Sequence, residues 1–418
     1  MKYEIVGGKV LSGKIRVSGN KNSVFPCISA ALLTDEEVIL ENISALSDTE
    51  VLIKILKKLG ISVSKNGSTL TIKANSIKQY TLPQELMTKL RGSIVLAGSM
   101  LSRMGKVIFY HPGGDIIGQR NIDSHLSGFK ALGVEIKRDN LKYFLQSQKR
   151  SGNFDVFLPE ASVTATENLI LASVIGKKVT VLRNCAKEPH VVDLCRMLTQ
   201  MGAIVEGIGS DTLKITGVEN IHGTKYRIGI DFIEIGTYAI AAAITGGKIQ
   251  IEGLDNTDLD PVRINLERFG IKFERVDDTL SIWAEKLKSI SNLTTNIWPG
   301  FPTDLMSAAI VLATQSKGVV LCHDWMYEGR MFFIDKLISM GANVTLADPH
   351  RVFVYGPGRL KGRSLETPDI RAGMALVLAS LVARGKSTIN QAELIERGYE
   401  DVCGKLKSLG AQIERIVE

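Results

Sequence analysis

The sequence predicts an α/β fold made of six repeats of about 70 residues, three in each of two domains. Two repeating patterns with the same period lead to this prediction. The length of 418 residues supports it, because so long a chain ordinarily divides into more than one hydrophobic core. The composition, 44% hydrophobic and 23% charged, is that of a globular protein.

The first pattern is a helix-like run that ends in Leu, Met or Phe, followed by glycine and an alternating strand. It occurs as KKLGISV, KALGVEI, TQMGAIV, ERFGIKF, ISMGANV and KSLGAQI. Its glycines, 68 to 73 residues apart, are Gly60, Gly133, Gly202, Gly270, Gly341 and Gly410. Glycine is expected here because the residue that ends a helix commonly has a positive φ.

The second pattern is a helix rich in small residues, followed by a turn and a strand, as in LASVIGKKVTVL and AAAITGGKIQIE. Its glycines, 67 to 71 residues apart, are Gly105, Gly176, Gly247, Gly318 and Gly385. The Ala, Ser and Gly content predicts tightly packed helices in the middle of each domain, enclosed by sheets.

Charged and hydroxyl-bearing residues stand where the first helix of each repeat is expected to begin. They are Lys21 and Asn22, Arg91, Ser162 to Thr164, Glu234, Asp304 and Arg371. Free N–H groups and the helix dipole attract anions to helix N-termini. Any one of these residues alone could be a helix cap, but the set predicts a site for a multiply charged ligand.

The net charge of +7 suits an anionic ligand. The chain has no block of basic residues interleaved with aromatic ones, so we predict no nucleic-acid partner. Gly8-x4-Gly13-Lys14 is similar to a phosphate-binding loop, but Ile15 replaces the metal-binding hydroxyl and a strand is expected there. Cys322-His323 has no second pair at ligand spacing, so we predict no metal.

Five scattered cysteines indicate reduced thiols in a cytoplasmic protein. The N-terminus has no apolar core of signal-peptide length, and the apolar stretches are too short to cross a bilayer. We therefore expect a cytoplasmic protein without membrane insertion. The sequence predicts no oligomeric state.

Several long motifs, in order along nearly the whole chain, resemble those of the UDP-N-acetylglucosamine enolpyruvyl transferases. They are SGNKNS, PGGDIIGQRNIDSH, FPTD, an EGR that ends at Arg330, DIRAGMALVLA and IERGYE. This family belongs to the superfamily of the shikimate-pathway enolpyruvyl transferase. The resemblance implies two inside-out α/β barrel domains of three repeats each, which close over ligands bound in the cleft between them. One domain would span residues 21–229 with a mobile loop at 112–119, and the other residues 1–20 plus 230–418.

The resemblance implies an enzyme that transfers the enolpyruvyl group of phosphoenolpyruvate to UDP-N-acetylglucosamine, the committed step of peptidoglycan precursor synthesis. Lys21, Arg120 and Arg397 would surround the donor phosphate, and Arg330 and Arg371 the donor carboxylate, because fixed cations suit these oxyanions.

The acceptor side is also implied by resemblance. Asp304 would be the base for the 3-hydroxyl, and Asn22 would contact the amino sugar. The nucleotide-sugar subsite would comprise Arg91, Arg120, Asn121, Ile122, Asp123, Ser124, Glu160, Ala161, Ser162, Val163 and the backbone of Met326. Glu188, Asp231 and Asp369 would support the site. Addition, followed by loss of phosphate from a tetrahedral adduct, would need no cofactor, because positioning and charge stabilisation lower the barrier.

The sequence departs from the family pattern mainly on the nucleotide side. Glu160 stands where lysine is common, Asn121 replaces proline, Thr164 glycine, Phe232 arginine and Gly329 asparagine. These departures leave open another UDP-amino sugar as acceptor, or a non-catalytic protein that binds UDP-sugars. The shikimate-pathway enzyme is a poorer match, because it lacks the loop that begins at Pro112.

Asp115 occupies the loop position where most family members have cysteine, and the resemblance implies that it is the proton donor. Its pKa would have to be raised above about 3.9, by burial or by a nearby charge.

We expect the enzyme to resist fosfomycin, an epoxide that alkylates the family cysteine, because a carboxylate is a much weaker nucleophile than a thiolate. Asp115→Cys should restore sensitivity and retain activity, whereas Asp115→Asn should lose most turnover. Residual activity after incubation with the drug measures the effect. Rapid covalent modification of the native protein at position 115 would contradict this prediction.

Overall fold

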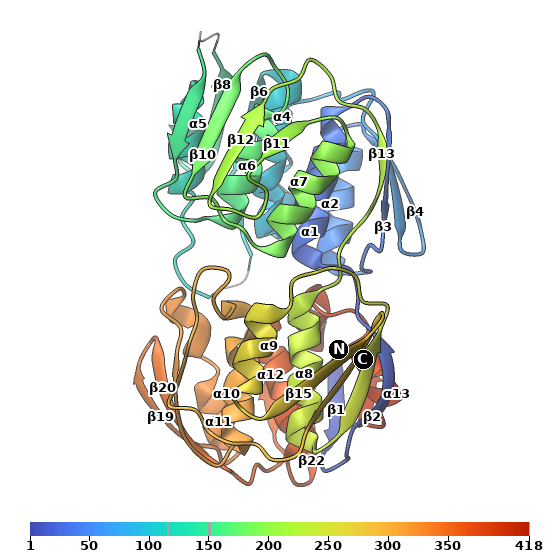
Figure 1. Ribbon diagram of the computed structural model, residues 1–418, viewed down its shortest axis with the longest axis vertical. Helices are drawn as coiled ribbons and strands as arrows, with labels where there is room; N and C mark the ends of the chain where they lie inside the picture. Colours follow the sequence, from blue (N-terminus) through green and yellow to red (C-terminus); the bar gives the residue numbers. More distant parts are fainter. Residues whose placement is uncertain (115–116, 149–151, 418) are drawn as a thin grey trace. The chain divides into compact units, whose positions relative to one another are not determined.

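The computed structural model describes residues 1–114, 117–148 and 152–417 (Figure 1). Contacts divide the chain into two units. Unit 1 comprises Met1–Ser18 and the described parts of Asp115–Gln119 and Ile230–Glu418. Unit 2 comprises Gly19–Gly114 and the described part of Arg120–Gly229. The segment 117–119 of unit 1 is therefore an insertion in the chain of unit 2.

Unit 2 contains three sheets within its described residues. The first has the order β13 (Thr224–Arg227), β3 (Glu37–Glu41), β5 (Thr69–Lys73) and β4 (Ser62–Asn66). The second has the order β6 (Lys106–Tyr110), β8 (Lys142–Ser147) and β7 (Val134–Asp139). The third has the order β11 (Ile204–Glu206), β12 (Thr212–Thr216), β10 (Val179–Arg183) and β9 (Phe154–Phe157).

Three sheets likewise form the described part of unit 1. One has the order β21 (Ser364–Glu366), β22 (Lys386–Asn390), β1 (Lys2–Val6) and β23 (Gln412–Ile416). Another has the order β15 (Ile271–Val276), β16 (Thr279–Ala284), β14 (Lys248–Glu252) and β2 (Ser12–Arg16). The last has the order β17 (Asn292–Thr294), β18 (Gly318–His323), β20 (Arg351–Gly356) and β19 (Asn343–Asp348).

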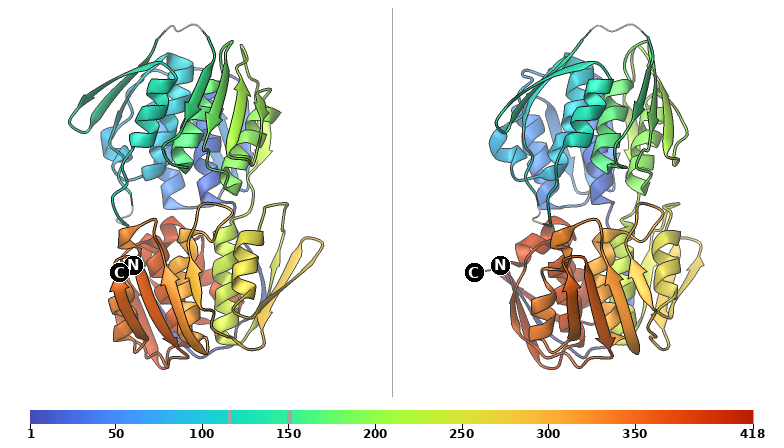
Figure 2. Two further views of the ribbon diagram at one scale, coloured as in Figure 1. Left: turned by 60° about the vertical axis from the view of Figure 1, so that its left-hand side comes forward. Right: turned by 90° about the vertical axis from the view of Figure 1, so that its left-hand side faces the viewer.

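Each unit has three nearly all-buried helices that contact one another. In unit 2 they are α1 (Lys21–Ala30), α4 (Leu96–Met104) and α6 (Val163–Ser173). In unit 1 they are α8 (Phe232–Thr245), α10 (Met306–Gln315) and α12 (Ile370–Val382). Within each unit the sheets lie outside these helices (Figures 1 and 2). Strands such as β5 and β22 bury alternate residues, so one face of their sheets packs inward.

The remaining helices are mostly amphipathic and cover the edges of the units. The α-helices are α2 (Ser47–Lys58), α3 (Gln84–Met87), α5 (Asp123–Ala131), α7 (Pro189–Gln200), α9 (Asp260–Glu267), α11 (Ile334–Ser339) and α13 (Val402–Ser408). The 3-10 helices are η1 (Ala31–Leu33), η2 (Arg91–Val95), η3 (Thr303–Leu305), η4 (Glu328–Met331) and η5 (Ala392–Arg397).

The N-terminal strands join unit 1 although most of that unit follows residue 229. Strand β1 lies between β22 and β23 and is antiparallel to both, and β2 runs parallel to β14. Because β2 is a paired strand, the glycines at 8 and 13 do not begin a phosphate-binding loop followed by a helix.

The six glycines of the first repeating pattern behave as predicted. Each follows a helix, has a φ between 84° and 100°, and precedes one of the strands β4, β7, β11, β15, β19 and β23. A side chain at such a φ would be strained, which explains why glycine recurs there.

The α/β class predicted from the sequence is confirmed. The barrel that the resemblance implied is not confirmed, because each sheet formed by the described residues is open.

Close packing of the central helices depends on small residues, as in α4 against α6. A Cβ added at Gly98 would lie 2.2 Å from the carbonyl oxygen of Asn168. The buried Asn168 side chain accepts a hydrogen bond from the Gly98 N–H (2.7 Å) and donates one to the carbonyl of Ile94 (3.0 Å). Asn168 thus satisfies backbone groups at the start of α4, where helices leave such groups unpaired.

We expect Gly98→Ala to lower the free energy of unfolding by about 1–3 kcal/mol, because the added methyl group would force α4 away from α6. The matched control is Gly358→Ala, where the nearest atom would be 3.5 Å away and the φ is not strained. Urea denaturation of both variants measures the difference. Equal stability of the two variants would show that the helix contact does not require glycine.

Candidate active site

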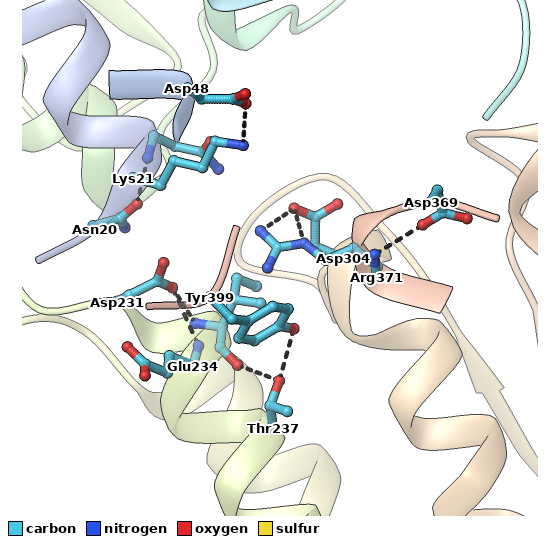
Figure 3. Close-up of polar contacts among 12 residues, drawn as sticks. Asn20, Lys21, Asp48, Asp231, Glu234, Thr237, Asp304, Asp369, Arg371 and Tyr399 are labelled. Atoms are coloured by element: carbon cyan, nitrogen blue, oxygen red, sulfur yellow. Dashed lines mark hydrogen bonds and ion pairs between the residues drawn. The ribbon is translucent and has the colours of Figure 1, made fainter. Parts of the chain in front are cut away.

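Asp304, in η3 of unit 1, is bound by two arginines, of which Figure 3 labels Arg371. Its Oδ2 accepts hydrogen bonds from Nε (3.1 Å) and Nη2 (2.8 Å) of Arg371, and its Oδ1 accepts one from Nη2 of Arg330 (3.0 Å). Both guanidinium groups are nearly buried, whereas the Asp304 side chain is 29% exposed. Charge-assisted bonds of this kind fix all three side chains.

Arg330, in η4, also lies near a second carboxylate, that of Asp324. Its Nε lies 3.9 Å from Oδ2 of the fully buried Asp324. Asp324 also accepts hydrogen bonds from the N–H groups of Met326 (3.0 Å) and Tyr327 (3.3 Å), and from the Thr303 hydroxyl. One buried carboxylate therefore shapes the turn that contains Met326 and braces Arg330.

Arg371 is the second residue of α12, whose N-cap is Asp369. The Asp369 carboxylate accepts from the N–H groups of Arg371 (2.8 Å) and Ala372 (2.9 Å). The guanidinium carbon of Arg371 lies 5.0 Å from the centre of the Tyr399 ring. The Tyr399 hydroxyl lies 3.0 Å from the hydroxyl of Thr237 in α8 (Figure 3). Capping and stacking thus set the direction of the guanidinium group.

Sequence reasoning missed Tyr399, Thr237 and Asp324. Tyr399 lies within the IERGYE motif, two residues after Arg397, so the motif contained a signal for it. Nothing in the sequence marks Thr237 or Asp324, because their roles depend on contacts between distant segments.

Asp231 caps α8, as its side chain accepts from the N–H groups of Ile233 (2.8 Å) and Glu234 (3.2 Å). Burial raises the pKa of Asp231, and the positive charge of Arg371 opposes that rise. Glu234 is buried against Lys405, and its Oε2 accepts from the Ser18 N–H (2.8 Å).

Arg397 is half-buried at the end of η5. The next residue, Gly398, packs on α12: a Cβ there would lie 2.4 Å from Ile370 and 3.7 Å from Nη1 of Arg371. The segment that contains Arg397 is therefore pressed against the helix start that contains Arg371.

Residues 117–119, the described part of the inserted segment, are hydrogen-bonded to η4. The N–H of Gln119 donates to Oε1 of Glu328 (2.7 Å), and the N–H of Gly329 donates to the carbonyl of Ile117 (2.9 Å). A Cβ at Gly329 would lie 2.6 Å from the carbonyl carbon of Ile117. Glycine in place of the family asparagine allows this contact. Asp115 lies outside the described residues.

In unit 2, Lys21 is the first residue of α1, and its Nζ lies 2.7 Å from Oδ2 of Asp48 in α2 (Figure 3). Asn20 caps α1 by accepting from the N–H of Asn22 (2.9 Å). Both side chains of the ion pair are almost fully buried. The ammonium group is thereby fixed in position beside a helix N-terminus, an arrangement that favours anion binding.

The predicted nucleotide-sugar residues, apart from Met326 in unit 1, lie at or just before the starts of η2, α5 and α6 in unit 2. Nη2 of Arg91 donates to the carbonyl of Asn121 (2.6 Å), and the Ser124 hydroxyl donates to Oε1 of Glu160 (3.0 Å). The remaining residues of this group are Arg120, half-buried; Ile122, buried; Asp123, exposed; and Ala161, Ser162 and Val163, half-buried. The structure therefore brings two pairs of these residues into direct contact.

Two departures from the family pattern also have local partners. Thr164 lies 3.0 Å from Nε2 of the buried His125, whose Nδ1 lies 2.9 Å from Nδ2 of Asn168. Phe232 packs its ring against Trp298 at a centroid distance of 5.0 Å. These residues are accommodated by the surrounding packing.

Glu188 precedes α7, and burial raises its pKa to about 7. Burial, and then the charge of Glu188, raises the pKa of the neighbouring Glu167 well above its ordinary value. Among the described residues, Oε1 of Glu167 and Oε2 of Glu188 are buried without a hydrogen-bond partner.

The start positions of the central helices were predicted correctly. Lys21 begins α1, Ser162 directly precedes α6, Glu234 lies in the first turn of α8, and Arg371 in that of α12. Asp304 lies in η3, directly before α10. Lys21 and Arg371 thus lie at helix starts, where the helix dipole favours anions.

Comparison with known proteins identifies close relatives. The family model described as EPSP synthase (3-phosphoshikimate 1-carboxyvinyltransferase) matches residues 5–406. The chain is 46% identical over 422 residues to the UDP-N-acetylglucosamine 1-carboxyvinyltransferase of Borreliella burgdorferi, with 99% of each chain covered. It is 43% identical over 423 residues to the enzyme of the same name from Treponema denticola, again with 99% of each covered.

Solved structures share the fold. The enolpyruvyl transferase NikO from Streptomyces tendae is similar with a TM-score of 0.87 at 24% identity, covering 99% of this chain and 98% of NikO. EPSP synthase from Acinetobacter baumannii has a TM-score of 0.78 at 18% identity, with both chains covered completely. Among the described residues, no helix combines the length and apolarity that a bilayer span requires.

We expect His125 to destabilise unit 2 as the pH falls below about 6.5. Burial, followed by the charge of Arg91, lowers the folded-state pKa of His125 to about 3 from 6.5. Between these two pKa values His125 is protonated in the unfolded chain but not in the folded protein. Acidification from pH 7 to pH 5 therefore lowers the free energy of unfolding by about 2 kcal/mol.

His125→Gln provides the comparison, because its amide offers one acceptor and one donor but does not titrate. The raised pKa of Glu188 acts in the opposite direction in both proteins and so cancels. Urea denaturation across this pH range should show the native protein losing more stability than the variant. Parallel pH profiles would contradict the prediction.

Proposed function

This chain belongs to the enolpyruvyl transferase family, and on that basis we propose that it transfers the enolpyruvyl group of phosphoenolpyruvate to the 3-hydroxyl of UDP-N-acetylglucosamine, releasing phosphate. One structural observation carries the proposal: two nearly buried guanidinium groups, of Arg330 and Arg371, bind the one partly exposed carboxylate of Asp304. This cluster contains both a receptor for a carboxylate and a base.

The donor carboxylate binds Arg330 and Arg371, whose planar forks suit two-point contact with it. The donor phosphate takes its contacts from Lys21, Arg120 and Arg397. The buried Lys21–Asp48 pair supports this assignment, because it holds the ammonium group in one place before the ligand arrives.

In the addition step the 3-hydroxyl oxygen attacks C2 of phosphoenolpyruvate, and its proton passes to Asp304. The methylene carbon, C3, takes a proton from the acid at position 115, which lies outside the described residues. In the elimination step the adduct loses phosphate together with one proton of the new methyl group, which forms the enolpyruvyl ether. Fixed positive charges stabilise the negative charge that develops on the donor.

The acceptor takes its contacts from Asn22 and from the starts of η2, α5 and α6. The high identity to two UDP-N-acetylglucosamine enzymes supports this sugar over another UDP-amino sugar. The product is a precursor of peptidoglycan. We also propose a cytoplasmic location, which the five buried free thiols support, because thiols remain reduced in that compartment.

We expect phosphate release when the protein is mixed with phosphoenolpyruvate and UDP-N-acetylglucosamine. Shikimate 3-phosphate should give no release above background, and mass spectrometry should find the enolpyruvyl ether of the sugar nucleotide. If another UDP-amino sugar were turned over faster, that sugar would replace UDP-N-acetylglucosamine as the assigned acceptor. No product with any of these acceptors would contradict the proposed activity.

A further inference from the structure

The carboxylate of Asp304 occupies donors that a substrate carboxylate would also use. Three N–H groups from two arginines point at its oxygens at 2.8 to 3.1 Å. Phosphoenolpyruvate carries a carboxylate of the same charge and geometry. Asp304 and the donor therefore compete for the same guanidinium groups, if the donor binds as proposed above.

The cluster is asymmetric in its exposure and in its support. The side chains of Arg330 and Arg371 are 1% and 8% exposed, whereas that of Asp304 is 29% exposed. The buried Asp324 lies 3.9 Å from Nε of Arg330, and the Tyr399 ring lies 5.0 Å from the guanidinium carbon of Arg371. The acid is thus the member of the cluster that can move, and the arginines are the fixed members.

Buried guanidinium groups make departure of Asp304 alone unfavourable. A buried charge that loses its partner costs several kcal/mol unless another charge replaces it. An incoming carboxylate would instead replace one anion by another, so the two guanidinium groups would keep a negatively charged acceptor throughout.

We propose that Asp304 holds the place of the donor carboxylate on Arg330 and Arg371, and that exchange of the two carboxylates releases Asp304 to act as the base. This inference rests on the proposed function. A carboxylate that accepts three charge-assisted hydrogen bonds is a poor proton acceptor, because a proton must compete with those donors. After exchange, the same carboxylate accepts the proton of the 3-hydroxyl as the C2–O bond forms.

If the exchange occurs, replacing Asp304 should strengthen the binding of phosphoenolpyruvate but slow turnover. Asp304→Asn removes the competing charge, so phosphoenolpyruvate alone should bind at least about tenfold more tightly than to the native protein, the factor for one lost charge-assisted competitor. Turnover should fall by about 10²-fold or more, because the base is absent. Isothermal titration with phosphoenolpyruvate and the phosphate-release assay give the two values.

Asp231→Asn is the matched control. Asp231 is a buried acid whose charge acts on Arg371, but it accepts hydrogen bonds from the backbone of α8, and asparagine is an equally good cap. If removing any nearby negative charge were sufficient, this variant would bind the donor as tightly as Asp304→Asn. If exchange occurs, Asp231→Asn should raise the affinity for phosphoenolpyruvate clearly less than Asp304→Asn does. The affinity for inorganic phosphate, which has no carboxylate, should rise little in Asp304→Asn.

Asp304→Ala serves as a second variant if the amide disturbs folding, and the same tightening is expected. A native protein that forms product, combined with Asp304 variants that bind phosphoenolpyruvate no better than it does, would overturn the exchange and leave the proposed function intact. The exchange would also be overturned if replacing Asp304 raised the affinities for phosphate and for phosphoenolpyruvate equally. A native protein that neither binds phosphoenolpyruvate nor forms product would overturn both.

Discussion

The constraint on which the site of unit 1 depends is the burial of two permanently charged guanidinium groups. Arginine does not lose its proton in a protein, so each buried group must be matched by negative charge and by acceptors. Asp304 and Asp324 supply the charge, and the Tyr399 ring supplies a polarisable face. Burial lowers the pKa of Arg371, but the charge of Asp304 and the other acidic groups near it outweighs that effect and raises the pKa above its ordinary value.

Helix capping fixes the positions from which the charged side chains of the site extend. Asp369 and Asp231 each bond the first free N–H groups of a central helix, which fixes where α12 and α8 begin. Because Arg371 is the second residue of α12, the cap also fixes the base of its side chain. In unit 2 Asn20 plays the same part for α1 and Lys21. Asp369, Asp231 and Asn20 thus act on the backbone, whereas Asp304 and Asp324 act on the arginine side chains.

The sequence was sufficient to predict features with a local or periodic signal. The recurring glycines gave the helix ends, because only the positive φ at Gly60 and its equivalents explains glycine at that period. Lys21, Asp304 and Arg371 were placed correctly at helix starts. The pairing of β1 with β22 and β23 had no local signal, since it joins residues at the two ends of the chain, such as Lys2 with Asn390 and with Ile416. Likewise, no pattern showed that the predicted base would lie in contact with both predicted carboxylate-binding arginines.

The place of β1 has a consequence for the order of folding. Residues 2–6 pair on one side with residues 386–390 and on the other with residues 412–416, so this sheet cannot form until the ribosome has synthesised both partners. The three sheets of unit 2 draw only on residues 37–227 and face no such delay. Unit 2 can therefore fold during translation while the first strands remain unpaired, with backbone groups free to pair with other chains until β22 and β23 are made.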